Sequence, residues 1–160
     1  MLPSHMRDDG RVAMVDVGAK PATERLARAR ATLRMAPETE AALRSATVAK
    51  GDAFAVAQIA GIMAAKETSR LIPLAHPLPL SSIDVSFAWL ESGLLSIEAV
   101  ARTVAQTGVE MEAMTAASVA ALAMYDMLKS LEKGLTIESV RLLEKRGGKS
   151  GTWLAPEPDA

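Results

Sequence analysis

The chain has 160 residues, of which 49 % are hydrophobic and 23 % are charged, and its net charge is −1. This size and composition fit one globular domain with a single core, and the near-zero charge argues against a general nucleic-acid-binding protein, which would show a basic face. The absence of cysteine excludes disulfides, thiolate nucleophiles and cysteine-based zinc sites.

The core has to be built from Ala, Val, Leu, Ile and Met side chains, because aromatic residues make up only 3 % of the chain. Small side chains let backbones approach closely, but each of them buries little apolar area. We therefore expect oligomerisation to add to the buried surface.

Residues 1–13, which begin MLPSHMRDDGR, precede the first predicted element. They lack a charged start followed by an apolar run, so they do not predict a signal peptide. No segment has the roughly 18 apolar residues that are needed to cross a bilayer. We expect a flexible N-terminal lead-in over 1–13 and a cytoplasmic protein without a membrane partner.

Residues 26–35 alternate small or aliphatic side chains with arginine and threonine. A period of two is typical of a strand with one buried and one solvated face. The stretch Pro37-Glu38-Thr39-Glu40 then predicts the start of a short helix, because proline suits the first turn and acidic residues suit the positive end of a helix.

A break at Lys50-Gly51 is followed by a second predicted helix over 53–66, for which Asp52 is a suitable N-cap. This helix is apolar on nearly all sides, so we expect it to be buried on more than one side. The segment 71–80, LIPLAHPLPL, ends it. Three prolines exclude a central strand or a helix there.

Alternating residues over 83–89 and 94–104 predict two strands that a turn at Glu91-Ser92-Gly93 joins into a hairpin. A long alanine-rich helix is predicted over 110–131, and residues 137–143 predict a last strand.

The predicted order is therefore β-α-α-β-β-α-β. Without the extra helix this is βαββαβ, the ferredoxin-like arrangement of an α+β fold, in which helices pack on one face of an antiparallel sheet.

The long predicted helix carries Asp126 and Lys129, which are three residues apart and so share a face. An ordinary surface ion pair is the simpler interpretation. Because the helix is apolar nearly all round, we instead expect its few charged groups to point into a shared cavity. Lys50 is a further candidate for a functional residue, since the helix dipole does not stabilise a cation just before a helix N-terminus. Lys66 has a simpler explanation, because the dipole does stabilise a cation at a helix C-terminus.

Two other features have simpler interpretations. His76 by itself is more often structural than catalytic, and a zinc site is not indicated, because the only other histidine, His5, lies in the lead-in. The stretch Gly148-Lys149-Ser150 resembles the end of a P-loop, but Leu143 occupies the required glycine position and no helix follows, so we reject that motif. A basic tail that orders over a polyanion and a flexible C-terminal tail over 152–160 both stay open.

Three long motifs carry a resemblance to a known family. They are KGDAFAVAQIAGIMAAKETSRLIPLAHPLPL, TGVEMEAMTAASVAALAMYDMLK and KRGGKSG. Together with MVDVGAK they resemble molybdenum cofactor biosynthesis protein C, the cyclic pyranopterin monophosphate synthase family, over residues 14–151. The resemblance implies a single domain over this range, a ferredoxin-like fold, and a homohexamer, described as a trimer of dimers, with active sites at the subunit interface.

The resemblance also implies a reaction. The family converts the small-molecule substrate 3′,8-cyclo-7,8-dihydro-GTP, made by a preceding radical enzyme, into cyclic pyranopterin monophosphate and diphosphate. The imidazole ring opens, a pterin forms, and a ribose oxygen attacks the α-phosphorus. These steps need acids and bases of tuned pKa and cations that bind a triphosphate. We expect no cofactor and no metal.

Site residues follow from the same resemblance. It assigns the catalytic aspartate to Asp126 and the essential lysines to Lys50 and Lys129. We expect the two lysines to transfer protons and contact phosphate, and Asp126 to hold or deprotonate its lysine neighbour. The substrate-binding positions are Leu74, Ala75, His76, Met111, Glu112, Lys20, Arg25, Lys66 and Glu110. Among these, we expect Lys20, Arg25 and Lys66 to neutralise the triphosphate.

The chain departs from the family pattern at three positions, where Ala75 replaces a cysteine, Arg70 an aspartate and Gln106 a lysine. None of them is a predicted catalytic residue, so we expect an active enzyme. The alternative from another class is a non-catalytic oligomeric module that binds a nucleotide or pterin. A plain structural protein fits less well, because it would not need so many ionisable groups on buried helices.

Overall fold

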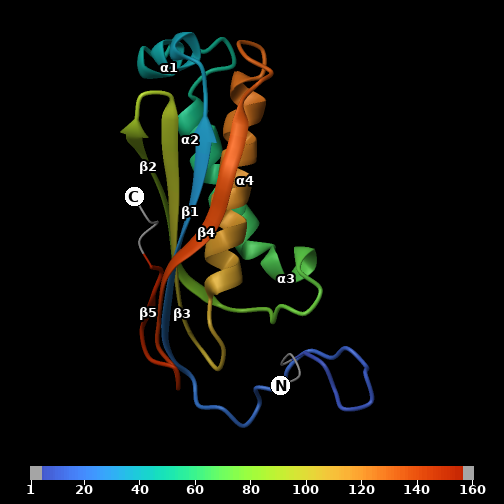
Figure 1. Cartoon of the computed structure of the whole chain (residues 1–160). Helices are drawn as coiled ribbons and strands as arrows, with labels where there is room; N and C mark the ends of the chain where they lie inside the picture. The colour runs from blue at the N-terminus through green and yellow to red at the C-terminus, as the bar shows by residue number, and fades with distance from the viewer. Residues whose placement is uncertain (1–4, 157–160) are drawn as a thin grey trace.

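A five-stranded antiparallel sheet forms one layer of the molecule, and helices cover one of its faces (Figure 1). The computed structural model describes residues 5–156. The strands lie in the order β2-β3-β1-β4-β5. The elements are β1 (Thr23–Arg34), α1 (Pro37–Arg44), α2 (Ala53–Lys66), α3 (Thr68–Leu71), β2 (Leu80–Glu91), β3 (Leu94–Ala105), α4 (Glu110–Leu128), β4 (Thr136–Arg146) and β5 (Trp153–Leu154). The predicted ferredoxin-like α+β fold is confirmed.

The central strand β1 has the two-faced character that its sequence predicts. Ala27, Ala31 and Leu33 are fully buried, on the face that packs against α4. Residues of the other face carry charge, and Arg30 donates to Glu98 on β3 with Nη2 2.6 Å from Oε1. Because successive side chains of a strand point to opposite faces, the alternating sequence decides which face is covered by helices.

Helices α2 and α4 pack closely because small residues line their contact. A Cβ at Gly61 would lie only 2.9 Å from the carbonyl oxygen of Ala116. Asp52 caps α2 as predicted, since its Oδ1 accepts from the N–H of Ala55 at 3.0 Å.

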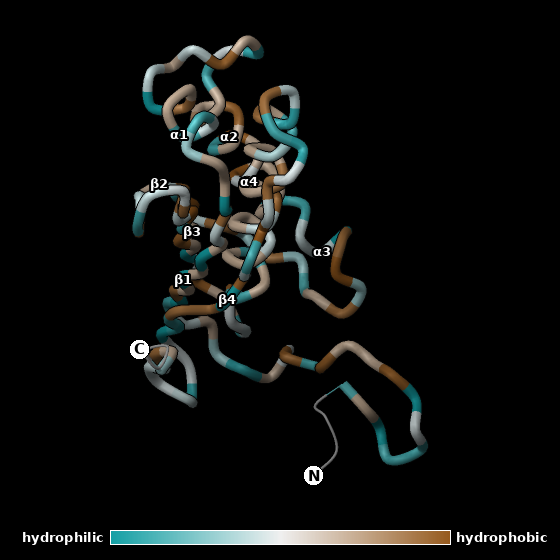
Figure 2. Tube along the Cα trace, turned by 45° about the horizontal axis from the view of Figure 1, so that its top comes forward, coloured by the Kyte–Doolittle hydropathy of each residue, from teal (hydrophilic) through white to brown (hydrophobic). Residues whose placement is uncertain are grey.

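The prediction that α2 is buried on more than one side is wrong for the single chain. The side chains Val56, Ile59 and Met63 are 43 to 60 % exposed. Figure 2 shows the hydrophobic residues along the chain. Only the side of α2 that faces the sheet and α4 is covered, because no further element within residues 5–156 lies over its other side.

The structure contains two short elements that the sequence did not predict, and one helix ends earlier than predicted. A short helix, α3, follows α2 before the proline-rich segment begins. The long helix ends at Leu128 rather than near 131, because the next residues form a tight turn on the Leu128 carbonyl. Within the expected C-terminal tail, Trp153–Leu154 forms β5 and pairs with β4.

A buried carboxylate joins α1 to the β2–β3 hairpin. Glu40 is 8 % exposed and accepts from the N–H of Gly93 at 2.6 Å, and from Arg44 at 2.7 Å. The hydrogen bond from Arg44 and the one from Gly93 lower the pKa of Glu40. The guanidinium of Arg44 also lies over the Trp89 ring, 4.3 Å from its centroid. None of the helices described within residues 5–156 is long and apolar enough to span a membrane.

Candidate active site

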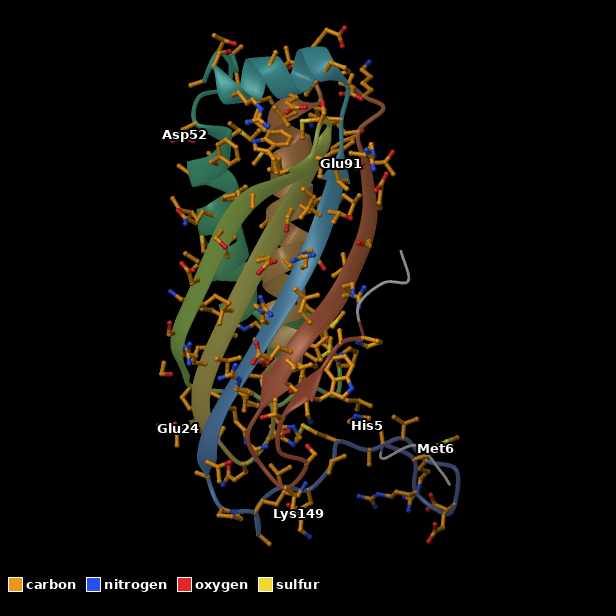
Figure 3. All side chains as sticks on the ribbon, turned by 60° about the vertical axis from the view of Figure 1, so that its left-hand side comes forward. His5, Met6, Glu24, Asp52, Glu91 and Lys149 are labelled. Atoms are coloured by element: carbon orange, nitrogen blue, oxygen red, sulfur yellow. The ribbon has the colours of Figure 1, made fainter. Side chains whose placement is uncertain are left out.

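The residues that the sequence singles out gather in two clusters at opposite ends of α4. Glu110 and Glu112 lie in its first turn, whereas Asp126 lies in its last turn. Figure 3 shows these two ends of the molecule, with Asp52, next to the Lys50 segment, at one end and Glu24, Lys149 and His5 at the other. At about 1.5 Å rise per residue, the fourteen steps from Glu112 to Asp126 span about 21 Å.

The first cluster consists of Lys50, Asp126 and Lys129, and we call it the Asp126 cluster. Lys129 Nζ lies 2.5 Å from Asp126 Oδ1, and Lys50 Nζ lies 3.3 Å from Oδ2. Lys50 Nζ also donates to the backbone carbonyl of Asp126 at 2.7 Å. A carbonyl in the last turn of a helix is left without an intrahelical donor, so Lys50 supplies one there.

Mutual hydrogen bonding shifts the pKa values of Asp126 and Lys129 in favour of their ionised forms. The pKa of Asp126 is lowered, first by the hydrogen bond from Lys129 and then by that from Lys50, and the pKa of Lys129 is raised by Asp126. Contrary to the expectation of a buried cavity, the side chains of Asp126 and Lys129 are 57 % and 50 % exposed in the single chain. The cluster is therefore preorganised on an open surface, with Lys129 protonated at neutral pH.

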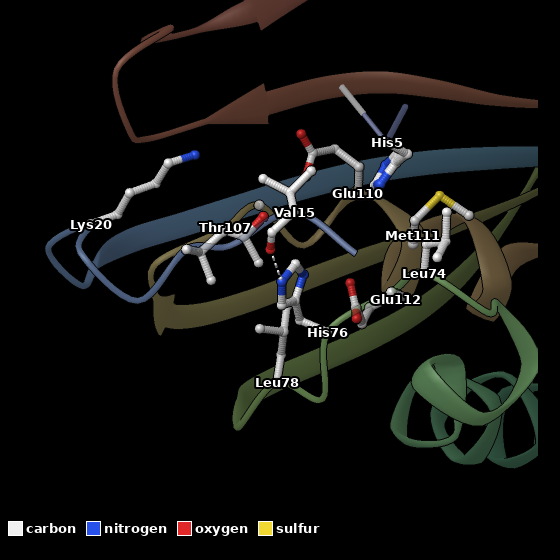
Figure 4. Close-up of a pocket in the computed structure, with 13 residues that line it drawn as sticks. His5, Val15, Lys20, Leu74, His76, Leu78, Thr107, Glu110, Met111 and Glu112 are labelled. Atoms are coloured by element: carbon white, nitrogen blue, oxygen red, sulfur yellow. Dashed lines mark hydrogen bonds between the residues drawn. The ribbon is translucent and has the colours of Figure 1, made fainter. Parts of the chain in front are cut away.

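The second cluster surrounds a cavity of about 340 Å³, which we call the His76 pocket (Figure 4). It brings together seven of the predicted substrate-binding residues, Lys20, Leu74, Ala75, His76, Glu110, Met111 and Glu112. The proline-rich segment after α3 forms one wall, and the first turn of α4 forms another.

The N-terminal segment supplies residues of the pocket that the sequence did not single out. Val15, Val17 and His5 line it, although His5 lies in the expected lead-in. His76 Nε2 lies 2.8 Å from the carbonyl oxygen of Val15. A carbonyl oxygen only accepts, so Nε2 carries the proton. The motif MVDVGAK belongs to the family resemblance, but no local pattern marked its backbone as part of a site.

Glu112 is the buried acid of the His76 pocket, with 4 % of its surface exposed. Burial raises its pKa, and the nearby Glu110 adds to that rise, while His76 opposes it. A carboxyl group of raised pKa holds its proton to a higher pH than an ordinary glutamic acid does, which suits Glu112 to proton transfer. The structure thus gives Glu112 a chemical character that the sequence pattern alone did not indicate.

A larger groove of about 680 Å³ adjoins the pocket and is rich in basic residues. Its cations are Lys20, Arg25, Lys145 and Lys149. Arg25 Nη2 donates to the Gln106 carbonyl at 3.3 Å, and Lys145 Nζ lies 3.3 Å from Glu110 Oε1. Lys145 and Lys149 were not among the predicted site residues, although the glycine-rich basic stretch KRGGKSG contained a signal for a polyanion site.

Of the other residues that the sequence analysis marked, Lys66 and Arg70 lie outside the two cavities, whereas Ala75 and Gln106 line them. Lys66 ends α2 and lies outside the residues that line the two cavities described here. Arg70 on α3 forms an ion pair with Glu67, the residue before this helix, at 3.2 Å, and the Arg70 side chain is 81 % exposed. Ala75 lines the pocket and Gln106 the groove. Within residues 5–156 no three His, Asp or Glu side chains are arranged to hold a metal ion.

Comparisons with known proteins all match this chain over almost its whole length. The model of the MoaC family matches residues 14–148. A protein from Novosphingobium aromaticivorans is 54 % identical over 154 residues, covering 96 % of this chain and 98 % of its own. One from Thermomicrobium roseum is 51 % identical over 158 residues, with 98 % and 95 % covered. One from Desulfitobacterium hafniense is 49 % identical over 151 residues, with 94 % and 93 % covered. All three are named cyclic pyranopterin monophosphate synthase.

Proposed function

The chain belongs to the MoaC family, and we propose that it acts in molybdenum cofactor biosynthesis as a cyclic pyranopterin monophosphate synthase. It converts 3′,8-cyclo-7,8-dihydro-GTP into cyclic pyranopterin monophosphate and releases diphosphate. The observation that carries this conclusion is the identity of about half of all residues to synthases over nearly the full length of both chains. The preorganised Asp126 cluster also supports this conclusion, because it places two lysines and an aspartate where they can act together on a substrate.

In the proposed mechanism the Asp126 cluster supplies proton donors and positive charge. Since the pKa of Asp126 is lowered and that of Lys129 is raised, Asp126 is a poor base and Lys129 is a protonated donor at neutral pH. Of the two roles expected for Asp126, the structure therefore favours holding the lysines over deprotonating one. Lys50 and Lys129 contact phosphate oxygens and move protons as the cyclic phosphate closes.

The His76 pocket and the basic groove bind the substrate in this proposal. Lys20 lines both cavities, so its charge serves the same ligand as Arg25 in the groove. A triphosphate in the groove would meet Lys20 and Arg25, whereas Lys66, the third cation that the resemblance names, lies outside both cavities of the single chain. Leu74, Ala75 and Met111 provide the contact surface of the pocket, and His76, Glu110 and Glu112 its polar groups.

We further propose a cytoplasmic homohexamer, a trimer of dimers, with active sites between subunits. The support is the separation of the two clusters. Groups about 21 Å apart on one helix cannot both reach one reacting centre within hydrogen-bonding distance. The exposed apolar side chains of α2 also favour a covered surface in the assembly.

Incubation with the cyclised GTP substrate, followed by detection of the pterin product and diphosphate, tests the activity. Lys50→Ala is expected to abolish turnover, and a Lys50→Ala protein with a near wild-type rate would refute the role of Lys50. Binding of the substrate without any turnover would instead favour the non-catalytic module. Size measurement tests the hexamer, and a stable monomer would exclude a shared site.

A further inference from the structure

An extended N-terminal segment, residues 13–20, crosses the His76 pocket, and we call it the strap. Val15, Val17 and Lys20 of the strap line the pocket, whereas Asp16 between them is exposed. Figure 4 shows the Val15 carbonyl directed at the His76 ring. The strap belongs to no helix or strand, so no helix or sheet hydrogen bonds fix its course over the pocket.

One side-chain hydrogen bond shapes the turn of the strap. Asp16 Oδ1 accepts from the N–H of Gly18 at 2.9 Å, and the N–H of Lys20 donates to the Val17 carbonyl at 2.9 Å. An aspartate that accepts from the backbone two residues on fixes a local turn in this way. Among the hydrogen bonds of the described residues, the one to Gly18 is the only one that Asp16 makes.

The contact with Val15 has a chemical consequence for His76. Because its Nε2 donates to that carbonyl at 2.8 Å, the neutral ring has its free electron pair on Nδ1. Nδ1 is then the nitrogen that remains for a ligand, and it can only accept a hydrogen bond or a proton. Figure 4 shows the ring between the Val15 carbonyl and the Glu112 carboxylate, inside the pocket.

We propose that Asp16 is a positioning residue: its turn holds the Val15 carbonyl on His76, which keeps the proton on Nε2 and presents Nδ1 as an acceptor to the substrate. The identity of the substrate rests on the proposed function, but the tautomer does not. Nδ1 thus meets an N–H or O–H group of the substrate rather than a phosphate oxygen, which has no proton to donate.

The chain has only two histidines, so selective ¹³C,¹⁵N-histidine labelling gives a simple NMR spectrum. His5→Gln assigns the His76 signals. At alkaline pH we expect the Nε2–H tautomer in the wild type, a mixture of tautomers in Asp16→Ala, and the wild-type signal in Asp16→Asn, which keeps an acceptor oxygen. Asp9→Ala is a matched control, because Asp9 accepts from the N–H of Arg11 in the same local manner outside the pocket. An Nδ1–H tautomer in the wild type, or an unchanged signal in Asp16→Ala, overturns the proposal.

Kinetics with the cyclised GTP substrate test whether His76 Nδ1 accepts a hydrogen bond from the substrate. For Asp16→Ala, kcat/KM should fall by about three- to tenfold, the range for loss of one ordinary hydrogen bond, and Asp16→Asn should restore it. A changed tautomer with unchanged kcat/KM would refute Nδ1 as the acceptor. A wild type that binds but never converts the substrate would refute the proposed function, while the tautomer result would stand.

Discussion

Two inactive variants that affect different clusters should restore activity when they are mixed in one oligomer. Lys50→Ala removes a cation of the Asp126 cluster, and Glu112→Gln removes the titratable acid of the His76 pocket. Each variant alone should be inactive, because every site in its oligomer lacks one group. If a site takes one cluster from each of two subunits, some sites of a mixed oligomer contain neither substitution.

The size of the recovery follows from the geometry. Glu112 and Asp126 lie about 21 Å apart along α4, so a site that uses both clusters would have to take them from different subunits. A site is intact only when its Asp126 cluster comes from a Glu112→Gln chain and its pocket from a Lys50→Ala chain. In an equal random mixture this holds for about one quarter of the sites.

The two variants are co-expressed with different affinity tags, and mixed oligomers are isolated by purification on both tags in turn. The assay then measures pterin formation by these oligomers. Mixing Lys50→Ala with Asp126→Ala is the control, since both substitutions affect the same cluster and no site becomes intact. If the Lys50→Ala and Glu112→Gln mixture gives no activity although mass spectrometry shows mixed oligomers, the two clusters do not serve one intersubunit site. Activity in the control mixture would refute the reasoning equally.

Three further substitutions test the energetics of the fold. Glu112→Gln should raise the melting temperature relative to the wild type, and this increase should grow from about pH 4 to about pH 8. The reason is that burial raises the pKa of Glu112 in the folded state, so ionisation of Glu112 destabilises the folded wild type. An equal increase at both pH values would contradict this. Glu40→Gln should lower the melting temperature at neutral pH, and the loss should shrink in acid, because Arg44 lowers the folded pKa of Glu40 and its contribution disappears as the pH falls through that value. Gly61→Val should destabilise the chain by about 1–3 kcal/mol in denaturant unfolding, because even its Cβ would lie 2.9 Å from the backbone of α4. Gly134→Ala is the control, with no neighbouring atom closer than 3.9 Å to the added Cβ, and an equal loss there would argue against the close helix contact.

The local features of the fold could be predicted from the sequence. The alternation through Ala27 and Leu33 predicted the two faces of β1, and Asp52 predicted the start of α2. These features depend on residues within a few positions of one another, because strand periodicity and helix capping are local interactions. The end of α4 at Leu128 was missed, since a turn made by the residues after it ends the helix while the apolar pattern continues.

The chemistry of the site depends on contacts between distant parts of the chain. Lys50 meets Asp126 across 76 positions, and His76 meets Val15 across 61. The family resemblance of the sequence identified Lys50, Asp126 and His76 as site residues. No local sequence pattern predicted the hydrogen bonds that these side chains make with distant residues. Only the packing of α2 against α4, and the course of the strap over the proline-rich wall, bring these groups together. Tertiary structure therefore decided the contact of Lys50 with Asp126, the burial of Glu112, and the hydrogen bond that fixes the proton of His76.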